Sequence, residues 1–258
     1  NPMDQHAKAG RQGRLTRIKL SDQIAEDLRR RIARDGLRPG DRLPHERALI
    51  EHYGCSKGTM REALKALEVE GLVRMLSGPN GGPEIQHASI DIVTQQLRQY
   101  LHFQKLDFAH VYALRQSLEV ALARNVTGRL SPGQLDRLAE NIRICETANA
   151  ARDRAVVRSA ETEFHDILCE ASDNVILVFM CRFLNSMLRD LVSYRSDSMR
   201  EHEHFGEANI ESHKQLLAAF WAGDAEAAGK IMHDHMCCAE GYMRRLDASF
   251  RSDLLSRF

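Results

Sequence analysis

Apolar residues recur at every third or fourth position along most of this chain, and short polar or glycine-containing breaks separate the resulting segments. This periodicity is typical of amphipathic helices. Beyond residue 90 it predicts helices over residues 90–103, 108–128, 132–150, 153–171, 175–198, 203–222 and 224–246. None of these segments has the strict alternation of a β-strand, so we expect this part of the chain to be a helical bundle.

The first ninety residues have a different order of elements. The spacing of apolar residues predicts three helices, over residues 18–33, 46–53 and 57–70. Gly54 separates the second helix from the third, and Ser56 is a favourable N-cap for the third. Residues 72–76 and 84–86 flank a glycine-rich loop and predict a small β-hairpin. This order of helices and hairpin is that of a winged helix-turn-helix.

The chain is therefore expected to be mainly α-helical and, at 258 residues, to contain two domains. We assign residues 15–87 to a winged helix-turn-helix with a small hairpin wing, and residues 88–250 to an all-helical domain. Residues 1–14 and 251–258 are expected to be terminal tails. The first tail is expected to be flexible, because it is rich in glycine, lysine, arginine and glutamine.

The charges are distributed unevenly between the two predicted domains. Lys plus Arg and Asp plus Glu both number 36, so the formal net charge is zero. Residues 8–65 nevertheless carry 15 basic and 8 acidic side chains, a net charge of +7. A basic amino-terminal domain joined to an acidic remainder favours an anionic partner, such as nucleic acid, for the first domain.

The composition excludes several other classes of protein. The longest apolar run is the seven residues from Val175 to Cys181, whereas a membrane-spanning helix needs about twenty. The polar first residues predict no signal peptide. The six cysteines form no C-x-x-C pair, so we interpret them as reduced thiols of a cytoplasmic protein rather than as a zinc site.

Two stretches of the first domain carry a family resemblance. They run from Leu37 to Leu49 (LRPGDRLPHERAL) and from Gly54 to Leu64 (GCSKGTMREAL), and Leu67-Glu68 and Glu70-Gly71-Leu72-Val73 follow them. Together they resemble the amino-terminal signature of the gluconate-repressor (GntR) family of bacterial regulators. The resemblance implies a DNA-binding winged helix.

In such a motif the second helix of the pair enters the major groove with its first residues against the base edges. Lys57 and Arg61 can donate hydrogen bonds to guanine or phosphate, and Gly58 permits close approach. The family also uses the arginine that corresponds to Arg47, and the wing tip is placed to approach the minor groove. The expected DNA-binding residues are Arg47, Ser56, Lys57, Gly58, Thr59, Arg61 and Gly78. Lys57 and His45 stand where relatives often have Arg and Ser, so the operator sequence is left open.

The second domain resembles the FCD effector domain of the fatty-acid-responsive (FadR-like) branch of that family. The matching segments are residues 114–119, Phe164-His165, residues 171–174, residues 211–213, Gly223-Asp224 and His235. The resemblance implies a helical domain that binds a small effector.

Four residues of the second domain form a candidate metal site. Glu161 and His165 are four residues apart and share one helix face. His213 and His235 lie in apolar stripes of later helices and are expected to point inward, whereas His233 is expected to face outward.

One carboxylate and three imidazoles suit a divalent ion, zinc first, with nickel or manganese as alternatives. Metal-binding FCD relatives use Asp, His, His and His here, so Glu161 stands where Asp is usual. The alternative is that the three histidines are hydrogen-bonded core residues.

Arg115 lies at the edge of an apolar stripe formed by Val111, Leu114, Leu118 and Leu122. A guanidinium in such a place needs a partner, because burying it unpaired is costly. It can anchor the carboxylate of an effector through a bidentate pair. Alternatively, it can form an internal salt bridge, for example with Glu119.

The combined interpretation is a ligand-responsive transcription regulator. Its expected partners are palindromic operator DNA, a small organic acid and a second copy of the chain. Two alternatives are a metal-sensing transcription factor, in which the ion is itself the signal, and a metal-dependent hydrolase. The chain has no nucleophile elbow, phosphate-binding loop or H-E-x-x-H motif, so a regulator without enzymatic activity is favoured.

Overall fold

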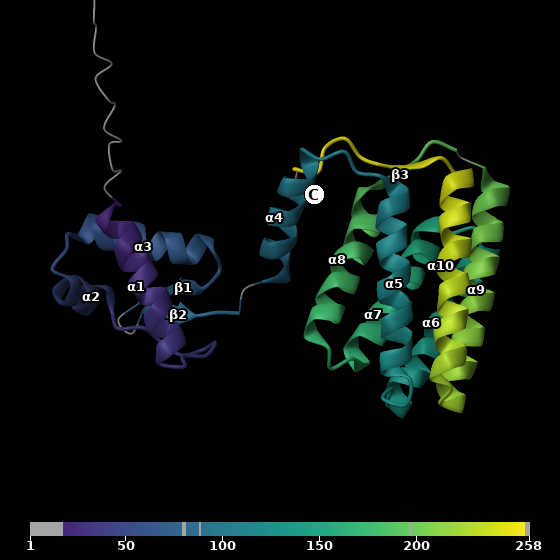
Figure 1. The fold of residues 1–258 in the computed structure, drawn as a ribbon, viewed down its shortest axis with the longest axis horizontal. Helices are drawn as coiled ribbons and strands as arrows, with labels where there is room; N and C mark the ends of the chain where they lie inside the picture. The colour runs from purple at the N-terminus through teal and green to yellow at the C-terminus, as the bar shows by residue number, and fades with distance from the viewer. Residues whose placement is uncertain (1–17, 79–80, 88, 197, 256–258) are drawn as a thin grey trace, which may run out of the picture. The chain divides into compact units, whose positions relative to one another are not determined.

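The computed structural model describes residues 18–78, 81–87, 89–196 and 198–255, which form two compact units (Figure 1). The boundary between the units lies between Val93 and Thr94, inside the helix α4 (Ile90–His102). Each unit has its own apolar core, and each is described here by itself.

The first unit is a winged helix-turn-helix, as the hydrophobic pattern predicts. Its helices are α1 (Leu20–Arg34), α2 (Glu46–Tyr53) and α3 (Lys57–Val69). The strand β1 (Val73–Leu76) pairs antiparallel with β2 (Gly82–Ile85), in a register that places Val73 opposite Ile85 and Leu76 opposite Gly82. These two strands form the wing.

One apolar cluster holds the first unit together. The helices α1 and α3 pack against each other, and both turn their apolar stripes inward. The buried side chains include Ile24, Leu28, Leu49, Met60, Leu64, Leu67, Val73 and Ile85. Gly54 ends α2 in the left-handed conformation, with φ 58°. Glycine adopts this conformation without steric cost, so the chain can turn sharply from α2 into α3.

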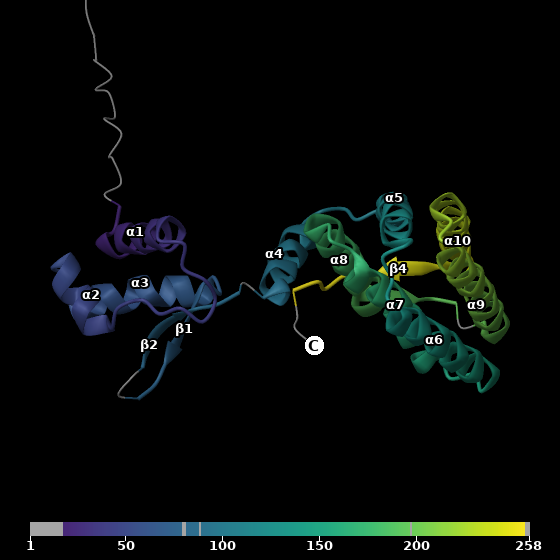
Figure 2. The same cartoon turned by 90° about the horizontal axis from the view of Figure 1, so that it is seen from below.

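The second unit is a bundle of helices with a short β-ribbon (Figure 2). After α4, its helices are α5 (Phe108–Val126), α6 (Pro132–Ala150), α7 (Arg154–Ala171), α8 (Val175–Leu191), α9 (Met199–Ala222) and α10 (Ala225–Arg245). Side-chain oxygens at the helix starts accept backbone N–H bonds and stabilise these ends. The capping residues are Asp107, Ser131, Asp153, Asn174, Ser198 and Asp224.

The core of the bundle is formed where four helix pairs meet. The helix α5 packs on α10, α6 packs on α7 and on α9, and α9 packs on α10. Side chains buried there include Leu122, Leu138, Phe164, Leu168, Leu216 and Met232. The apolar stripes that predict the helices therefore face one another across the bundle.

The segment after α8 differs from the helix expected over residues 175–198. α8 ends at Leu191, and β3 (Val192–Tyr194) pairs antiparallel with β4 (Ala248–Phe250). The expectation of a continuous helix and of a domain without strands is wrong here. Ser193 and Ser249 face each other although they are 56 residues apart, and a local hydrophobic period cannot reveal such pairing. The helix α9 also begins earlier than expected, because Ser198 caps it at Met199.

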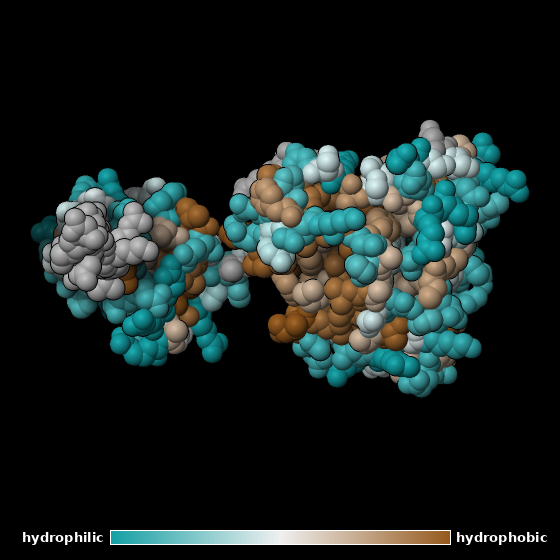
Figure 3. Space-filling model, turned by 45° about the horizontal axis from the view of Figure 1, so that its top comes forward, coloured by the Kyte–Doolittle hydropathy of each residue, from teal (hydrophilic) through white to brown (hydrophobic). Residues whose placement is uncertain are grey.

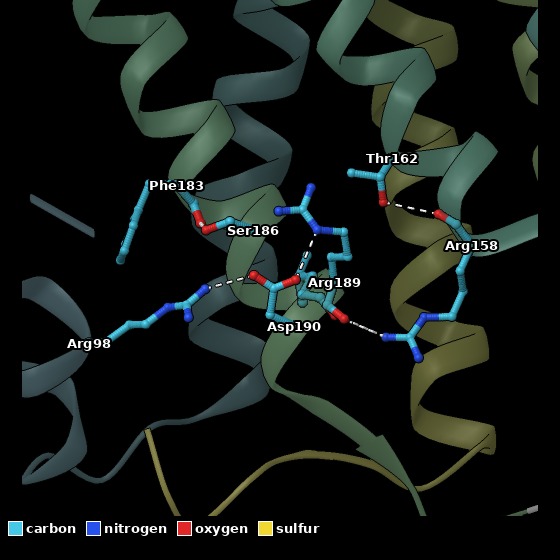
Figure 4. A network of polar contacts seen from close by, with 8 residues as sticks. Arg98, Arg158, Thr162, Phe183, Ser186, Arg189 and Asp190 are labelled. Atoms are coloured by element: carbon cyan, nitrogen blue, oxygen red, sulfur yellow. Dashed lines mark hydrogen bonds and ion pairs between the residues drawn. The ribbon is translucent and has the colours of Figure 1, made fainter. Parts of the chain in front are cut away.

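Helix α4 and the last described residues are tied to α8. Nη2 of Arg98 donates to Oδ2 of Asp190 at 2.8 Å, and the arginine is largely buried (Figure 4). Leu254 is buried in a cluster with apolar side chains of α4 and α8. Its N–H donates to Nδ1 of His102 at 3.4 Å. Residues 251–255, which the sequence assigns to a tail, therefore pack against the bundle.

Candidate metal and effector site, and candidate DNA-binding helix

Three histidines from three helices meet inside the second unit. His165 comes from α7, His213 from α9 and His235 from α10, with exposed fractions of 2%, 1% and 3%. One ring nitrogen of each lies within 4.8 Å of those of the other two. His233, two residues before His235 on α10, is exposed. The structure therefore turns the three predicted ligands inward and His233 outward.

Aromatic stacking holds one of these rings in place. The ring of His213 stacks on Phe164, with 3.7 Å between centroids and 7° between planes. The centroids of His213 and His235 are 4.9 Å apart, and those of His165 and His235 are 5.5 Å apart. Close packing of this kind restricts ring rotation, so the nitrogen atoms point in defined directions.

His165 is oriented from behind by a buried carboxylate. Its Nδ1 lies 2.8 Å from Oε2 of Glu119, which is fully buried on α5. An ionised carboxylate only accepts hydrogen bonds, so Nδ1 donates and Nε2 is the nitrogen left to face the other two histidines. Metal-binding histidines are usually held in this way. The sequence analysis includes Glu119 in a segment that resembles the FCD domain and as a partner of Arg115, but it does not predict the contact with His165.

The other two rings present unpaired nitrogen atoms. Among the described residues, Nε2 of His213 and Nδ1 of His235 are buried and have no hydrogen-bond partner. Leaving a buried polar atom without a partner costs about 1–3 kcal/mol, so these two nitrogen atoms are candidates for binding a ligand. Together with His165 they form a three-nitrogen donor set that fits a divalent transition ion.

Burial keeps two of these histidines neutral. It lowers the pKa of His213 and of His235 well below the usual value, and the charges of His165 and Arg115 act in the same direction. Burial alone would raise the pKa of Glu119, but attraction by His165 and Arg115 outweighs it, so that pKa is lowered. Neutral imidazoles beside an ionised carboxylate are the protonation states that metal binding requires.

Glu161 lies beside the histidine group but not within it. Its Oε1 accepts a hydrogen bond from Nδ2 of Asn209 at 2.6 Å. Burial raises its pKa to about 7, against the opposing effects of Asn209, Arg115 and Arg158. Glu161 lines the same pocket as the three histidines, so its role as a fourth ligand stays a prediction.

Arg115 reaches this pocket from α5. Its Nε donates to Oδ1 of Asn185 at 3.3 Å and lies 3.9 Å from Oε1 of Glu119. The pocket, which we call the histidine pocket, encloses about 60 Å³. The internal ion pair that was the alternative to an effector anchor is therefore present. Because the guanidinium also lines the pocket, the two roles do not exclude each other.

In the first unit, the start of α3 is capped and exposed. Oγ of Ser56 accepts a hydrogen bond from the N–H of Thr59 at 3.1 Å. Lys57 and Gly58 are exposed. A Cβ at Gly58 would meet only Oγ of Ser56, at 3.8 Å. Packing within the unit therefore does not require glycine at this position. The absence of a side chain would instead let a binding partner approach the helix closely.

Two of the predicted arginines flank this helix start. Nε of Arg61 lies 3.2 Å from Oε1 of Glu46, and Nε of Arg47 lies 3.3 Å from Oε1 of Glu51. The arginine side chains are 63% and 91% exposed. Exposed ion pairs contribute at most about 1 kcal/mol, so these guanidinium groups can exchange a glutamate for a phosphate or base.

The wing contributes one described residue to the predicted DNA contacts. Gly78 is exposed between β1 and β2, and its φ of 100° favours glycine. Residues 79 and 80, which belong to the predicted wing tip, lie outside the described residues.

Comparison with known families matches both units. Residues 20–79 match the bacterial regulatory proteins of the gntR family, and residues 110–237 match the FCD domain. Together the two matches span more than half of the chain. The chain belongs to the GntR family of bacterial regulatory proteins. Both assignments agree with the resemblance in the sequence.

Related proteins are transcription regulators as well. One from Escherichia coli K12, whose name assigns it to regulation of the L-lactate dehydrogenase operon, is 29% identical over 89% of this chain and 88% of that protein. The HTH-type transcriptional regulator LutR of Bacillus subtilis is 26% identical over 79% of this chain and 92% of its own length. The solved structure of Streptococcus agalactiae GntR, 22% identical, has a TM-score of 0.58 and covers 86% of this chain and 99% of that one.

These findings distinguish a transcription regulator from a metal-dependent hydrolase. The family and the similar proteins are regulators and not enzymes, so the hydrolase alternative is set aside. The fold class predicted from the sequence, a winged helix followed by a helical FCD domain, is confirmed. Among the described residues, no helix is both long and apolar enough to cross a membrane.

The neutral state of His213 predicts how the stability of this GntR protein depends on pH when metal is removed. Its pKa is lowered in the folded state, so unfolding takes up a proton below about pH 6.5, the ordinary histidine value. The free energy of unfolding therefore falls as the pH falls through that value. Between about pH 6.5 and 5, the wild type should lose about 1.4 kcal/mol per pH unit more than His213→Gln. Denaturant titrations in chelator measure this difference.

Two controls isolate the histidine. Glu161 acts in the opposite direction, because its pKa is raised from 4.5 to about 7 and unfolding releases its proton. It is present in both proteins, so its contribution cancels in the comparison. His233→Gln, which replaces an exposed histidine of α10, should keep the wild-type slope. Parallel slopes for the wild type and His213→Gln would contradict a neutral buried His213.

Proposed function

We propose that this chain is a ligand-responsive transcription regulator whose FCD unit holds a divalent metal ion and senses a small organic acid. The observation that carries the proposal is the convergence of His165, His213 and His235, with unpaired buried nitrogens, in the pocket that Arg115 lines. The GntR unit supplies DNA binding. We place the protein in the cytoplasm, where operator DNA is found.

The exposed start of α3 is the proposed reading element. Lys57, Gly58 and Arg61 would face the base edges of the major groove, while Arg47 and the wing around Gly78 would contact the backbone. Ser56 and Thr59 would fix the start of the helix through their mutual hydrogen bonds. Two such helices in a homodimer would bind the two halves of a palindromic operator.

Exposed apolar side chains on the FCD unit support the homodimer. Figure 3 shows apolar surface gathered on one face of this unit. Leu114 of α5 is 45% exposed, and Val175 and Ile176 of α8 are 76% and 69% exposed. The two helices pack on each other. Apolar surface of this kind is typical of a face that binds another protein surface.

Replacing Arg61 tests the DNA-binding proposal. Arg61→Ala should weaken operator binding about tenfold to a hundredfold, as expected for the loss of a direct contact to a base. The fold should change in stability by less than about 1 kcal/mol, because the ion pair of Arg61 with Glu46 lies at the surface. Gel-shift titrations and thermal denaturation measure the two effects.

Arg30→Ala is the matched control, since Arg30 is also an exposed arginine and is paired with Glu26 on α1. It should bind the operator like the wild type. Binding by the wild type should also fall steeply with salt, because phosphate contacts release counterions. Unchanged binding by Arg61→Ala, or an equal loss with Arg30→Ala, would reject α3 as the reading helix.

The donor set supports a transition metal ion, with zinc as the first choice and nickel or manganese as alternatives. His165, His213 and His235 would hold the ion, and Glu161 would supply an oxygen ligand from the pocket wall. A bound ion would offer a positive charge to which a carboxylate effector can bind. Glu119 would hold the ring of His165 in the orientation that binding needs.

Elemental analysis of purified variants tests the metal proposal. His213→Ala should lower both the bound metal and the melting temperature, because a ligand that binds only the folded state stabilises it. Glu119→Gln should weaken metal binding about tenfold to a hundredfold, measured by competition with a chelator, because the hold on His165 is lost. His233→Ala, on the exposed side of α10, should change neither quantity.

Variants of Glu161 separate its two possible roles. If Glu161 is a ligand, Glu161→Ala should lower the metal content and Glu161→Asp should retain it. Loss of metal in His213→Ala but not in Glu161→Ala would leave a site of three histidines. Equal metal content in the wild type, His213→Ala and Glu161→Ala would end the metal proposal and leave three core histidines.

The effector proposal rests on the positive side chains of the pocket. Arg115 and Arg158 both line it, next to the three histidines. A carboxylate fits such a site, because it can pair with a guanidinium and with a metal ion. The relative whose name refers to the L-lactate dehydrogenase operon is in keeping with an organic acid signal.

Arg115→Lys distinguishes an effector anchor from a purely structural arginine. Lysine keeps a positive charge near Glu119 but cannot form a bidentate pair with a carboxylate. The variant should keep its metal content and stability, while organic acids should affect DNA binding at least about tenfold less strongly. Gel-shift titrations with the acid as variable measure this effect.

Arg124→Ala provides the control on the same helix, since Arg124 pairs with Glu226 at the surface. It should respond to acids like the wild type. An acid response unaffected by Arg115→Lys would leave Arg115 as an internal ion pair. DNA binding that responds to metal concentration and to no acid would instead favour the metal-sensing alternative.

A further inference from the structure

A second cavity adjoins the histidine pocket and is several times larger. It encloses about 380 Å³, compared with about 60 Å³ for the histidine pocket. Arg158, Glu161 and Tyr194 line both cavities, so the two meet at these side chains. We call the larger cavity the outer chamber. Its other lining residues include Ala155, Val157, Met199, Phe205 and Gly206.

The histidine pocket alone is too small for most ligands. Its 60 Å³ corresponds to roughly the share of liquid volume taken by two water molecules. That space admits a carboxylate group and little more. Ligand sites usually enclose roughly 300–1,000 Å³, and the outer chamber falls within that range. An acid whose carboxylate reaches Arg115 therefore finds room for the rest of its structure in the outer chamber.

The junction between the cavities presents polar groups that are held in place. Nη2 of Arg158 donates to the backbone carbonyl of Arg189 at 2.9 Å (Figure 4), and the guanidinium lies 5.3 Å from the ring centroid of Tyr194. Glu161 is held by its hydrogen bond from Asn209. A donor and an acceptor fixed at this place can bind a hydroxyl group next to a carboxylate.

Beyond the junction the outer chamber is lined by apolar side chains, among them Val157, Met199 and Phe205, and by polar ones that include Arg154 and His202. Val157 and Phe205 are buried there. The nearby guanidinium of Arg152 is already paired with Glu203. A ligand tail that packs against these apolar side chains is therefore expected to be apolar itself.

We propose that the outer chamber is a second subsite for the effector, and that the effector is a hydroxy acid with an apolar tail of medium length. This inference rests on the proposed acid-sensing function. The carboxylate occupies the histidine pocket, the hydroxyl lies at Arg158 and Glu161, and the tail fills the outer chamber. Ala155, an exposed residue on the wall formed by α7, limits how much space the tail has.

Two acids with the same head group test this subsite in the metal-loaded, full-length protein. Each methylene buried in an apolar site increases affinity about fourfold, so 2-hydroxyoctanoate should bind at least about tenfold more tightly than lactate. Ala155→Trp fills the outer chamber and should remove this gain while leaving lactate affinity, metal content and DNA binding unchanged. Ser159→Trp, which places the same side chain at an exposed position of α7 outside both cavities, should keep the gain. Isothermal titration calorimetry measures the affinity of each of the three proteins for both acids.

The outcomes separate this inference from the function on which it rests. Equal affinity for lactate and 2-hydroxyoctanoate, or a gain that survives in Ala155→Trp, overturns the second subsite while leaving acid sensing in place. Gluconate is a hydroxy acid whose tail carries hydroxyl groups. If it binds more tightly than 2-hydroxyoctanoate, the proposal that the tail is apolar is overturned. Binding of none of these acids, with metal present, overturns both the subsite and the acid-sensing function.

Discussion

The burial of polar side chains at the centre of a helical bundle is the constraint on which the second unit depends. Three imidazoles and the carboxylate of Glu119 lie where apolar side chains would be more stable. Nε2 of His213, Nδ1 of His235 and Oε1 of Glu119 have no hydrogen-bond partner among the described residues. Each such atom costs about 1–3 kcal/mol. The stabilisation from the surrounding apolar core and from the capped helix starts offsets this cost. A ligand that pairs with these atoms would remove it.

One chain of contacts links the proposed effector anchor to a proposed metal ligand. Arg115 lies 3.9 Å from Oε1 of Glu119, and Oε2 of the same carboxylate is bonded to His165. In a buried environment such contacts polarise one another. An acid that draws the guanidinium toward itself would therefore change the charge that Glu119 presents to His165. Thermodynamic linkage then requires that acid and metal affect each other's affinity by the same factor.

The first unit positions its proposed DNA-binding residues with a core of its own. Leu64 and Leu67 are buried and pack α3 against the core of the unit. Lys57, Gly58 and Arg61 lie at the start of α3 or on its exposed side. The effector therefore does not need to rebuild the reading helix. In the proposed mechanism it acts by favouring one state of the dimer over another, to the extent that it binds that state more tightly.

The sequence by itself determined the helices, the order of the two domains and the inward direction of the histidines. The helices over residues 46–53 and 132–150 have the predicted bounds, because Ser131, Gly54 and the apolar spacing are local signals. Only the tertiary structure determined which side chains each inward-facing residue contacts. The bond from His165 to Glu119, the bond from Asn209 to Glu161 and the pairing of β3 with β4 join residues 46, 48 and 56 positions apart. Hydrophobic periodicity encodes which face of an element is buried, but it carries no information about the element that covers that face. For the same reason the two cavities emerged only from the packing of the helices.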